Sequence, residues 1–389
     1  MNVEQYKNKV FNEIENLCPS LIELSDWMAD NPEISGEEIK ISRKVSSLLK
    51  ENNFDVTEQF MDIPTAFSGE INYSKGKNIS FLMEYDALPG IGHGCGHNIS
   101  GCISLLAALA LSRHKECIKG SLRLVGTPDE EAKGPKVQMT NFGAFDDCDF
   151  AMMIHMCNDS MIVKPFVALD AIEFVYTGRT SHAGTSPWLG VNALNGVQLL
   201  FHAIDMMRQH VKPDVRMHGV ILEGGLGPTP NMVPERAVAR FQFRAHSREY
   251  LDQVVARVMD CAAGAALATG TEFSYSYFEP KADEMKRNSA AEALVSDIYQ
   301  EIGVSIDPLG DYETISSDVF RVSQKCPTIH SYLAICNREH ALHTASFAKA
   351  TKSKQAHDAL LKGAKIMALT ALKIYWDDEV SGEIKADAK

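Results

Sequence analysis

The chain has 389 residues, of which 45% are hydrophobic and 23% charged, and its formal net charge at pH 7 is −13. This length leaves room for two or more domains with sizeable cores, and the composition is that of an ordinary globular protein. A strongly acidic chain is poorly suited to bind nucleic acid or an anionic membrane surface, so we expect neither as a partner.

Three features indicate the compartment. The N-terminal segment MNVEQYKNKVFNEIE is charged and amphipathic, unlike a secretory signal. The longest apolar run, CISLLAALAL, has ten residues and is too short to cross a bilayer. Nine cysteines occur without the spacing of a disulfide framework, which is typical of a reducing compartment. We therefore expect a cytoplasmic protein.

The first half of the chain alternates helical and strand-like patterns. Ser35 and Glu38 have the spacing of a capping box, and they flank the start of a helical pattern over 37–53. The patterns that follow are a strand at 78–88, a helix at 98–114, and strands at 120–128 and 149–156. Strands that alternate with helices predict a mostly parallel sheet with helices on both faces.

The middle of the chain follows another order. Between residues 169 and 281 the patterns alternate as β-α-β-β-α-β, which is the order of a ferredoxin-like unit. A strand-like run at 328–335 and a long closing helix then resume the first pattern. The predicted fold class is therefore α/β. One mostly parallel-sheet domain, made of residues 1–168 and 282–389, is interrupted by an α+β domain at 169–281.

A glycine-rich loop follows the strand-like run at 78–88. In GIGHGCGHN, residues 90–98, four glycines alternate with His93, Cys95 and His97. Glycine permits tight turns and close approach of the backbone to a bound group. Cysteine and histidine two positions apart, on a loop after a strand, are suited to bind a metal ion. Taken alone, the same residues also fit a buried or solvated loop without a ligand.

Other candidate side chains lie near the ends of later strand-like runs. They are Asp129, Glu130, Glu131, His155, His340 and His343. Adjacent carboxylates can divide the work of a metal site, because one binds the ion while its neighbour accepts a proton. A solvated acidic face, a core histidine and surface histidines are the alternative interpretations of these residues.

Six segments in this order resemble peptidase family M20, which contains dinuclear metallopeptidases and amidohydrolases. The segments are EYDALPGIGHGCGHN, GTPDEE, MMIHM, SHAGTSPWLGVNAL, PNMVP and LHT. Each is weak alone, but six in the right order are specific, and the resemblance covers nearly the whole chain. The most similar branch contains aminoacylases, aminobenzoyl-glutamate hydrolases and β-alanyl dipeptidases.

The resemblance implies two divalent metal ions per chain, Zn or Mn. Their implied ligands are Cys95, His97, Glu131, His155 and His343. It also implies that Glu130 is the general base and that Asp86 orients a metal ligand. Cys95 must be a thiolate to bind, and we expect it to bridge the two ions. His93 and His340 match no ligand position of the family.

For the inserted domain, the resemblance implies a lid and dimerisation role. His182 matches a histidine that stabilises the tetrahedral oxyanion, and in several relatives this histidine serves the neighbouring subunit's site. Asn231 and Arg244 match positions that hold the substrate, whose carboxylate suits a guanidinium. A solvated loop histidine and an exposed strand arginine are the alternatives. We therefore expect a homodimer with composite active sites.

The implied reaction is hydrolysis of the amide bond of a dipeptide or an N-acyl amino acid, with Glu130 accepting a proton from water. The alternatives are a non-catalytic metal- or peptide-binding homologue, which need not keep Glu130, and a mononuclear zinc protein. Two positions depart from the pattern. Asn98 stands where much of the branch has Asp, and SSDVFRVSQ at 316–324 lacks a glycine that relatives often have, which leaves the roles of Ser317 and Asp318 open.

Overall fold

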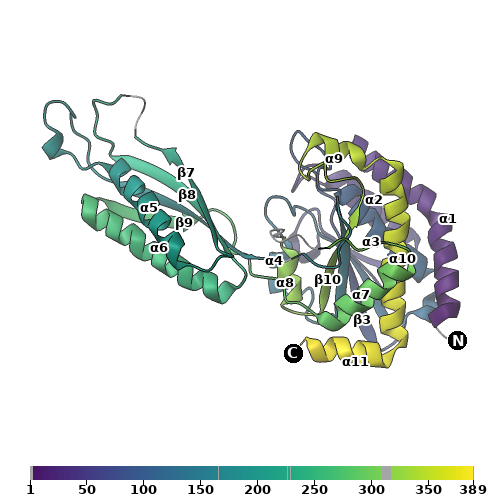
Figure 1. The fold of residues 1–389 in the computed structure, drawn as a ribbon. Coiled ribbons are helices and arrows are strands. Elements are labelled where there is room, and N and C mark those ends of the chain that lie inside the picture. The colour runs from purple at the N-terminus through teal and green to yellow at the C-terminus, as the bar shows by residue number, and fades with distance from the viewer. Residues whose placement is uncertain (1–2, 165, 226, 228, 309–316, 389) are drawn as a thin grey trace. The chain divides into compact units, whose positions relative to one another are not determined.

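The computed structural model describes residues 3–388, apart from 165, 226, 228 and 309–316. The described residues form two compact units (Figure 1). The first contains residues 3–164, 285–308 and 317–388, and the second contains residues 166–284. The predicted insert, 169–281, lies within the second unit.

A six-stranded sheet forms the middle of the first unit, with the strand order β1-β2-β4-β3-β5-β10. The strands are Asp55–Glu58 (β1), Phe67–Asn72 (β2), Lys77–Met83 (β3), Gly120–Gly126 (β4), Phe150–Cys157 (β5) and Thr328–Ala334 (β10). β4, β3, β5 and β10 run parallel, whereas β1 and β2 form an antiparallel edge. The predicted, mostly parallel sheet is confirmed. The carboxyl ends of four neighbouring strands therefore meet at one edge, where ligands bind in such sheets.

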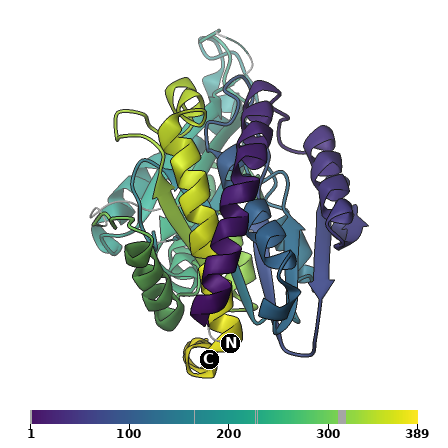
Figure 2. The same ribbon diagram turned by 90° about the vertical axis from the view of Figure 1, so that its right-hand side faces the viewer.

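The helices of the first unit pack around this sheet. The three long ones contact one another, and they are Val3–Asp30 (α1), His97–Ser112 (α3) and Lys354–Trp376 (α10). Figure 2 shows α1 in purple beside α10 in yellow. Every residue of α3 is buried, because α3 lies between the sheet and the other two helices, which accounts for the apolar run CISLLAALAL.

The shorter helices complete the first unit. They are Ile39–Glu51 (α2), Lys136–Asn141 (α4), Ser289–Glu301 (α7), Val319–Ser323 (α8), Ala345–Ala350 (α9) and Asp378–Asp387 (α11), with short 3-10 helices at Phe60–Asp62 and Lys115–Cys117. Among the helices described in either unit, none combines the length and the apolar character that crossing a membrane requires.

The start of α2 corrects one expectation. Ser35 and Glu38 do not form a capping box, because both side chains have partners distant in sequence. The Ser35 hydroxyl donates to Asp86, and the buried Glu38 carboxylate accepts from the backbone N–H of Asp129. The carboxylate of Glu33 instead accepts from the first N–H groups of the helix. These contacts tie the start of α2 to the acidic loop after β4.

The second unit is an antiparallel sheet covered by two helices. Its elements are, in chain order, Ala168–Thr177 (β6), Ala193–Met207 (α5), Arg216–Glu223 (β7), Arg236–Ala245 (β8), Arg248–Thr269 (α6) and Glu272–Tyr277 (β9), with short 3-10 helices at Pro187–Leu189 and Arg208–His210. The strand order is β7-β8-β6-β9. Both helices contribute to one apolar core with the sheet. The predicted ferredoxin-like unit is confirmed.

Local sequence signals begin and end the helices of this unit. The side chain of Asn192 caps the start of α5, and the side chain of Ser247 caps α6. Gly270 ends α6 with φ at +70°, a left-handed conformation that glycine adopts without strain.

Candidate metal centre

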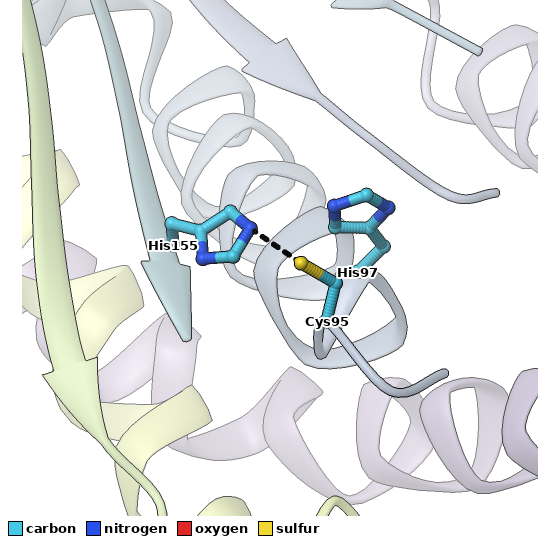
Figure 3. A group of neighbouring side chains, drawn as sticks. All are labelled: Cys95, His97 and His155. Atoms are coloured by element: carbon cyan, nitrogen blue, oxygen red, sulfur yellow. Dashed lines mark hydrogen bonds between the residues drawn. The ribbon is translucent and has the colours of Figure 1, made fainter. Parts of the chain in front are cut away.

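The glycine-rich loop lies against the end of β5. Gly96 has φ at +80°, and a Cβ atom there would lie 2.5 Å from the Cβ of Met156. No residue with a side chain could follow this path without displacing its neighbour. The close approach holds Cys95 and His97, which begins α3, beside His155 on β5 (Figure 3).

The five predicted metal ligands come together in the first unit. The Cys95 sulfur lies 3.6 Å from His155 Nε2 and 3.3 Å from His343 Nε2. His343 Nε2 also lies 3.6 Å from a carboxylate oxygen of Glu131. Within each of three groups the ligand atoms lie no more than 4.8 Å apart; the groups are Cys95–His97–His155, Cys95–Glu131–His343 and His97–Glu130–Glu131. Cys95 belongs to two of them, as a residue between two ions would.

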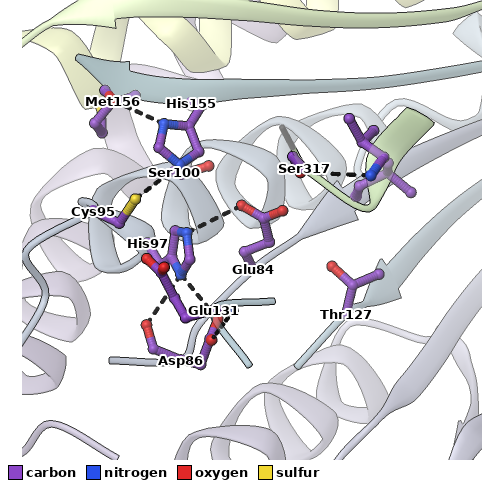
Figure 4. A network of polar contacts seen from close by, with 12 residues as sticks. Glu84, Asp86, Cys95, His97, Ser100, Thr127, Glu131, His155, Met156 and Ser317 are labelled. Atoms are coloured by element: carbon purple, nitrogen blue, oxygen red, sulfur yellow. Dashed lines mark hydrogen bonds and ion pairs between the residues drawn. The ribbon is translucent and has the colours of Figure 1, made fainter. Parts of the chain in front are cut away.

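Asp86 orients two members of this cluster. One carboxylate oxygen lies 2.9 Å from His97 Nδ1, and the other accepts from the backbone N–H of Glu131 at 3.0 Å (Figure 4). Because this hydrogen bond occupies Nδ1, Nε2 is the ring nitrogen of His97 that faces the cluster. Burial by itself would raise the pKa of Asp86, but the charge and hydrogen bond of His97 outweigh it and lower this pKa.

His155 is held in a similar way. Its Nδ1 lies 2.8 Å from the carbonyl oxygen of Met156, so Nδ1 carries the proton and Nε2 is left as a ligand atom. Burial lowers the pKa of His155 to about 4, which keeps the ring neutral, the form that binds metals.

Lys136 joins two buried carboxylates next to the cluster. Its Nζ lies 2.7 Å from a Glu84 oxygen and 2.6 Å from an Asp318 oxygen, and all three side chains are buried. The second Glu84 oxygen lies 3.3 Å from His97 Nε2. Burial raises the pKa of Glu84, but the charges of Lys136 and His97 outweigh it and lower this pKa to about 2. Asp318 is thus a partner of Lys136.

Sequence reasoning missed Glu84 and Lys136. Their only signal was a single charged residue in each of the segments SFLMEY (80–85) and GPKVQM (134–139). The amide of Asn98, in contrast, donates to the carbonyl and the hydroxyl of Ser25 on α1.

Glu130 lies between the two groups of carboxylates. Its oxygens are near His97 and Glu131 on one side and near Glu84 and Asp318 on the other. Burial raises the pKa of Glu130 well above its ordinary value, and the charges of Glu84 and Asp318 raise it further. A carboxylate that holds a proton this readily is suited to general base and acid work.

The backbone at this site is strained at two residues. Asp129, directly before Glu130, has φ at +56°, and His343 has φ at +61°. Such conformations are costly for residues other than glycine and persist where the surrounding structure imposes them, often at functional sites. Contacts of the backbone hold both, since Asp129 N–H donates to Glu38 and His343 N–H donates to the carbonyl of Gly94.

The cluster fits a pair of divalent cations. Glu131 has one buried carboxylate oxygen without a hydrogen-bond partner among the described residues, and the buried His97 Nε2 and Glu84 oxygen face each other at 3.3 Å without forming a hydrogen bond. Thiolate, imidazole and carboxylate together are the donors that zinc prefers. Burial raises the pKa of the Cys95 thiol well above its ordinary value, so a cation is needed to hold it as a thiolate.

Two candidates of the second unit lie side by side. His182 is exposed on the loop after β6, and the segment around it pairs with the segment around Met232. The carbonyl of Asn231 accepts from the backbone N–H of Ala183 at 2.7 Å. His182 Nδ1 accepts from the backbone N–H groups of Gly184 and Thr185, at 3.2 and 3.1 Å. The neutral ring therefore carries its proton on Nε2, as a donor.

Arg244 is not near these two residues. It lies near the end of β8 and pairs with Leu169, whereas the 231–233 segment precedes the start of β8 at Arg236. Eight residues of strand between Arg236 and Arg244 correspond to roughly 26 Å. Arg244 is half-buried, and burial lowers its pKa. The structure therefore places the three predicted residues of the insert at opposite ends of one sheet.

The candidate metal ligands thus lie at the ends of parallel strands in an α/β unit, and the second unit is a ferredoxin-like insert. Residues 81–373 match the sequence profile of peptidase family M20/M25/M40, and the chain belongs to this family. It is a metal-dependent hydrolase of the M20 type.

Known relatives cover most of the chain. The Xaa-Arg dipeptidase of Mus musculus is 30% identical over 100% of this chain and 93% of its own length. One of the subunits of the p-aminobenzoyl-glutamate hydrolase of Escherichia coli is 32% identical over 64% of this chain and 56% of its own length.

Solved structures share the fold. A Bacillus subtilis protein described as a dinuclear metal-binding peptidase of the M20 family has a TM-score of 0.74 and 17% identity, over 92% of this chain and 99% of that one. A Klebsiella pneumoniae aminobenzoyl-glutamate utilization protein has a TM-score of 0.68 and 17% identity, over 97% of this chain and 100% of that one.

Proposed function

We propose that the protein hydrolyses the amide bond of a dipeptide or an N-acyl amino acid at a centre of two divalent cations, Zn or Mn. The observation that carries this proposal is the convergence of five ligand side chains on one another with Glu130 among them. It is supported by the similarity to a dipeptidase along the whole chain. A non-catalytic homologue need not keep a carboxylate at this place, and Glu130 is present among the ligand side chains.

The chain's own residues suit each step of such a reaction. The bound cations would supply Lewis acidity, which lowers the pKa of water and polarises the substrate carbonyl. Glu130 takes the proton of the attacking water and passes it to the leaving amine. Asp86 keeps His97 and the loop of Glu131 in place while this happens.

His182 is suited to stabilise the oxyanion. With Nδ1 occupied by two backbone N–H groups, Nε2–H is the donor, and the side chain is exposed. A neutral donor aimed at the developing negative charge typically contributes about 10²–10³ in kcat.

The positions of the three insert residues support a composite dimer. A dipeptide spans about 7 Å, so it cannot touch His182 and Arg244 of one chain across roughly 26 Å of strand. We therefore propose that each active site of the dimer uses Arg244 from one chain and His182 with Asn231 from the other.

The edge of the second sheet offers a surface for this dimer. β7 is an edge strand, and three consecutive apolar residues on it, Val220, Ile221 and Leu222, are 54%, 41% and 52% exposed. An exposed apolar edge is a template for pairing with another strand. Pairing of two β7 strands would extend the sheet across a two-fold axis.

We also propose that the protein works in a reducing compartment, as a cytoplasmic enzyme. Support comes from its nine cysteines, all of which are free thiols in the structure and eight of which are buried.

A reconstitution experiment tests the proposed function. The metal-stripped protein is loaded with Zn, Mn or Co, and its metal content and its hydrolysis of alanyl-arginine, aminobenzoyl-glutamate and N-acetyl amino acids are measured. We expect close to two ions per chain and turnover of at least one compound. One ion per chain would instead indicate a mononuclear zinc protein, and two ions without any turnover a binding homologue.

A further inference from the structure

One oxygen of the Glu84 carboxylate faces a nitrogen of the candidate metal centre. Glu84 directly follows β3, and its side chain is buried. Its Oε2 lies 3.3 Å from Nε2 of His97, and neither atom has a hydrogen-bond partner among the described residues. Figure 4 shows the carboxylate beside the edge of the His97 ring that carries Nε2. A buried carboxylate oxygen without a partner costs folding free energy, and such a group in a native protein calls for an explanation.

The packing of α3 holds Glu84 in this place. His97 and Gly101 are four residues apart, so both lie on one face of the helix. A Cβ atom at Gly101 would lie 2.4 Å from the backbone carbonyl oxygen of Glu84. The end of β3 therefore approaches this face as closely as only glycine permits. The other carboxylate oxygen, Oε1, lies 2.7 Å from Lys136 Nζ, which fixes the direction of Oε2.

His97 has no proton for this oxygen once its ring binds a cation. Nδ1 of His97 lies 2.9 Å from a carboxylate oxygen of Asp86, so Nε2 is the ring nitrogen left as a ligand atom. A nitrogen that gives its lone pair to a cation donates no hydrogen bond. A proton on Nε2 can therefore serve Glu84 only in the metal-free protein. With the cation bound, Oε2 is an unpaired buried charge unless it contacts the cation itself.

The spacing suits two ligands of one ion. Zinc binds nitrogen and oxygen ligands at about 2.0–2.2 Å, and a tetrahedral arrangement then separates two ligand atoms by roughly 3.3–3.6 Å. The separation of Glu84 Oε2 from His97 Nε2, 3.3 Å, lies in this range. The group Cys95–His97–His155 supplies three ligands for one ion. Three protein ligands are typical of an open zinc site, and four of a closed one.

We propose that Glu84 is a further metal ligand, which completes the coordination of the ion held by Cys95, His97 and His155. This inference rests on the metal centre of the proposed function. It makes the two ions different, because the group Cys95–Glu131–His343 keeps three ligands and with them an open position. The closed ion ties the end of β3 to the glycine-rich loop and to β5.

A crystal structure of the wild type loaded with zinc alone is the direct test. We expect one ion at about 2.0–2.2 Å from both Glu84 Oε2 and His97 Nε2. An ion bound to His97 but more than about 3 Å from either Glu84 oxygen would refute the inference and leave the proposed function standing. Absence of any ion at this cluster would refute both. If Glu84 is a ligand and the enzyme hydrolyses none of the compounds, only the proposed function is wrong.

Glu84→Gln measures how much this ligand contributes to binding. The amide keeps the size of the side chain and loses the negative charge. In competition with a chelator, one of the two zinc ions should bind more weakly by more than about 10²-fold, because groups that only orient ligands already contribute about 10–100-fold. Unchanged affinity for both ions would overturn the inference.

Asp318→Asn is the matched control. It removes a negative charge from the same lysine, since Asp318 Oδ1 lies 2.6 Å from Lys136 Nζ, and it leaves the group Cys95–His97–His155 untouched. We expect both zinc ions to bind within about tenfold of the wild type. Equal losses of affinity in Glu84→Gln and Asp318→Asn would mean that Glu84 acts only through the charge of the cluster, and the inference would be wrong.

Discussion

The candidate residues of the two units differ in how they are held. In the first unit, Cys95, His97 and His155 are buried and contact one another or shared carboxylates. In the second unit, His182 and Asn231 are exposed on loops, and Arg244 lies at the other end of the sheet. The first unit therefore builds a chemical centre by itself. The second presents its candidates separately, without bringing them together.

The strongest test of this difference removes the residue shared by two ligand groups. Cys95→Ala should lose at least one metal ion and almost all turnover, because Cys95 lies within 3.6 Å of both His155 and His343. Metal analysis and circular dichroism measure the ions and the fold. Cys261→Ala, a thiol of the second unit, is the control and should leave both unchanged. Full metal content and activity in Cys95→Ala would show that the cluster is not the metal site.

Glu130→Gln separates chemistry from binding in the same unit. The amide cannot accept a proton, so kcat should fall by about 10²–10⁴-fold, while both ions and substrate affinity remain. Asp129→Asn, one residue earlier, is the matched control because Asp129 belongs to none of the ligand groups. Wild-type turnover in Glu130→Gln would exclude this carboxylate from the mechanism.

Lys136→Met tests whether the buried charges of the first unit depend on one another. The change leaves Glu84 and Asp318 without their common partner, and breaking a buried ion pair costs about 3–5 kcal/mol. Denaturant unfolding measures this loss. Lys133→Met is the control, since the Lys133 side chain is 81% exposed and its pair with Asp129 is weak. Equal stability of the two variants would mean that the buried pairs contribute little.

Mixing inactive variants tests the second unit. His182→Ala should lower kcat by about 10²–10³-fold. If His182 serves the partner, exchange of subunits with Glu130→Gln gives each heterodimer one intact site. Since half of the dimers are mixed and half of their sites are intact, about a quarter of wild-type activity should return.

Two controls sharpen this experiment. Arg244→Ala mixed with Glu130→Gln should stay inactive, because both residues would be missing from sites of their own chains. His202→Ala, at an exposed histidine on α5, should be active without mixing. Recovery with Arg244→Ala but not with His182→Ala would reverse the assignment of the two residues. If neither mixture recovers activity although exchange of subunits is proven, neither His182 nor Arg244 acts in the active site of the partner chain.

Much of the fold followed from local patterns. Alternating periodicity predicted the parallel sheet and the ferredoxin-like insert, and Gly270 ends α6 as its position suggests. The predicted capping box was wrong, because the side chains of Ser35 and Glu38 bind partners 51 and 91 residues away in sequence. A short sequence motif does not reveal whether its side chains bind residues that are distant in sequence.

By itself, the sequence determined the parallel strands of the first unit, the division into two kinds of sheet, and the loop that presents Cys95 and His97, but not the antiparallel edge strands β1 and β2. The wider ligand set required a resemblance to known proteins. Only the tertiary structure decided which charged groups meet, because Lys136 contacts carboxylates 52 and 182 residues away. The physical reason is that periodicity reports local hydrogen bonding and burial, whereas the neighbours of a strand's end depend on the order β4-β3-β5-β10 in the sheet.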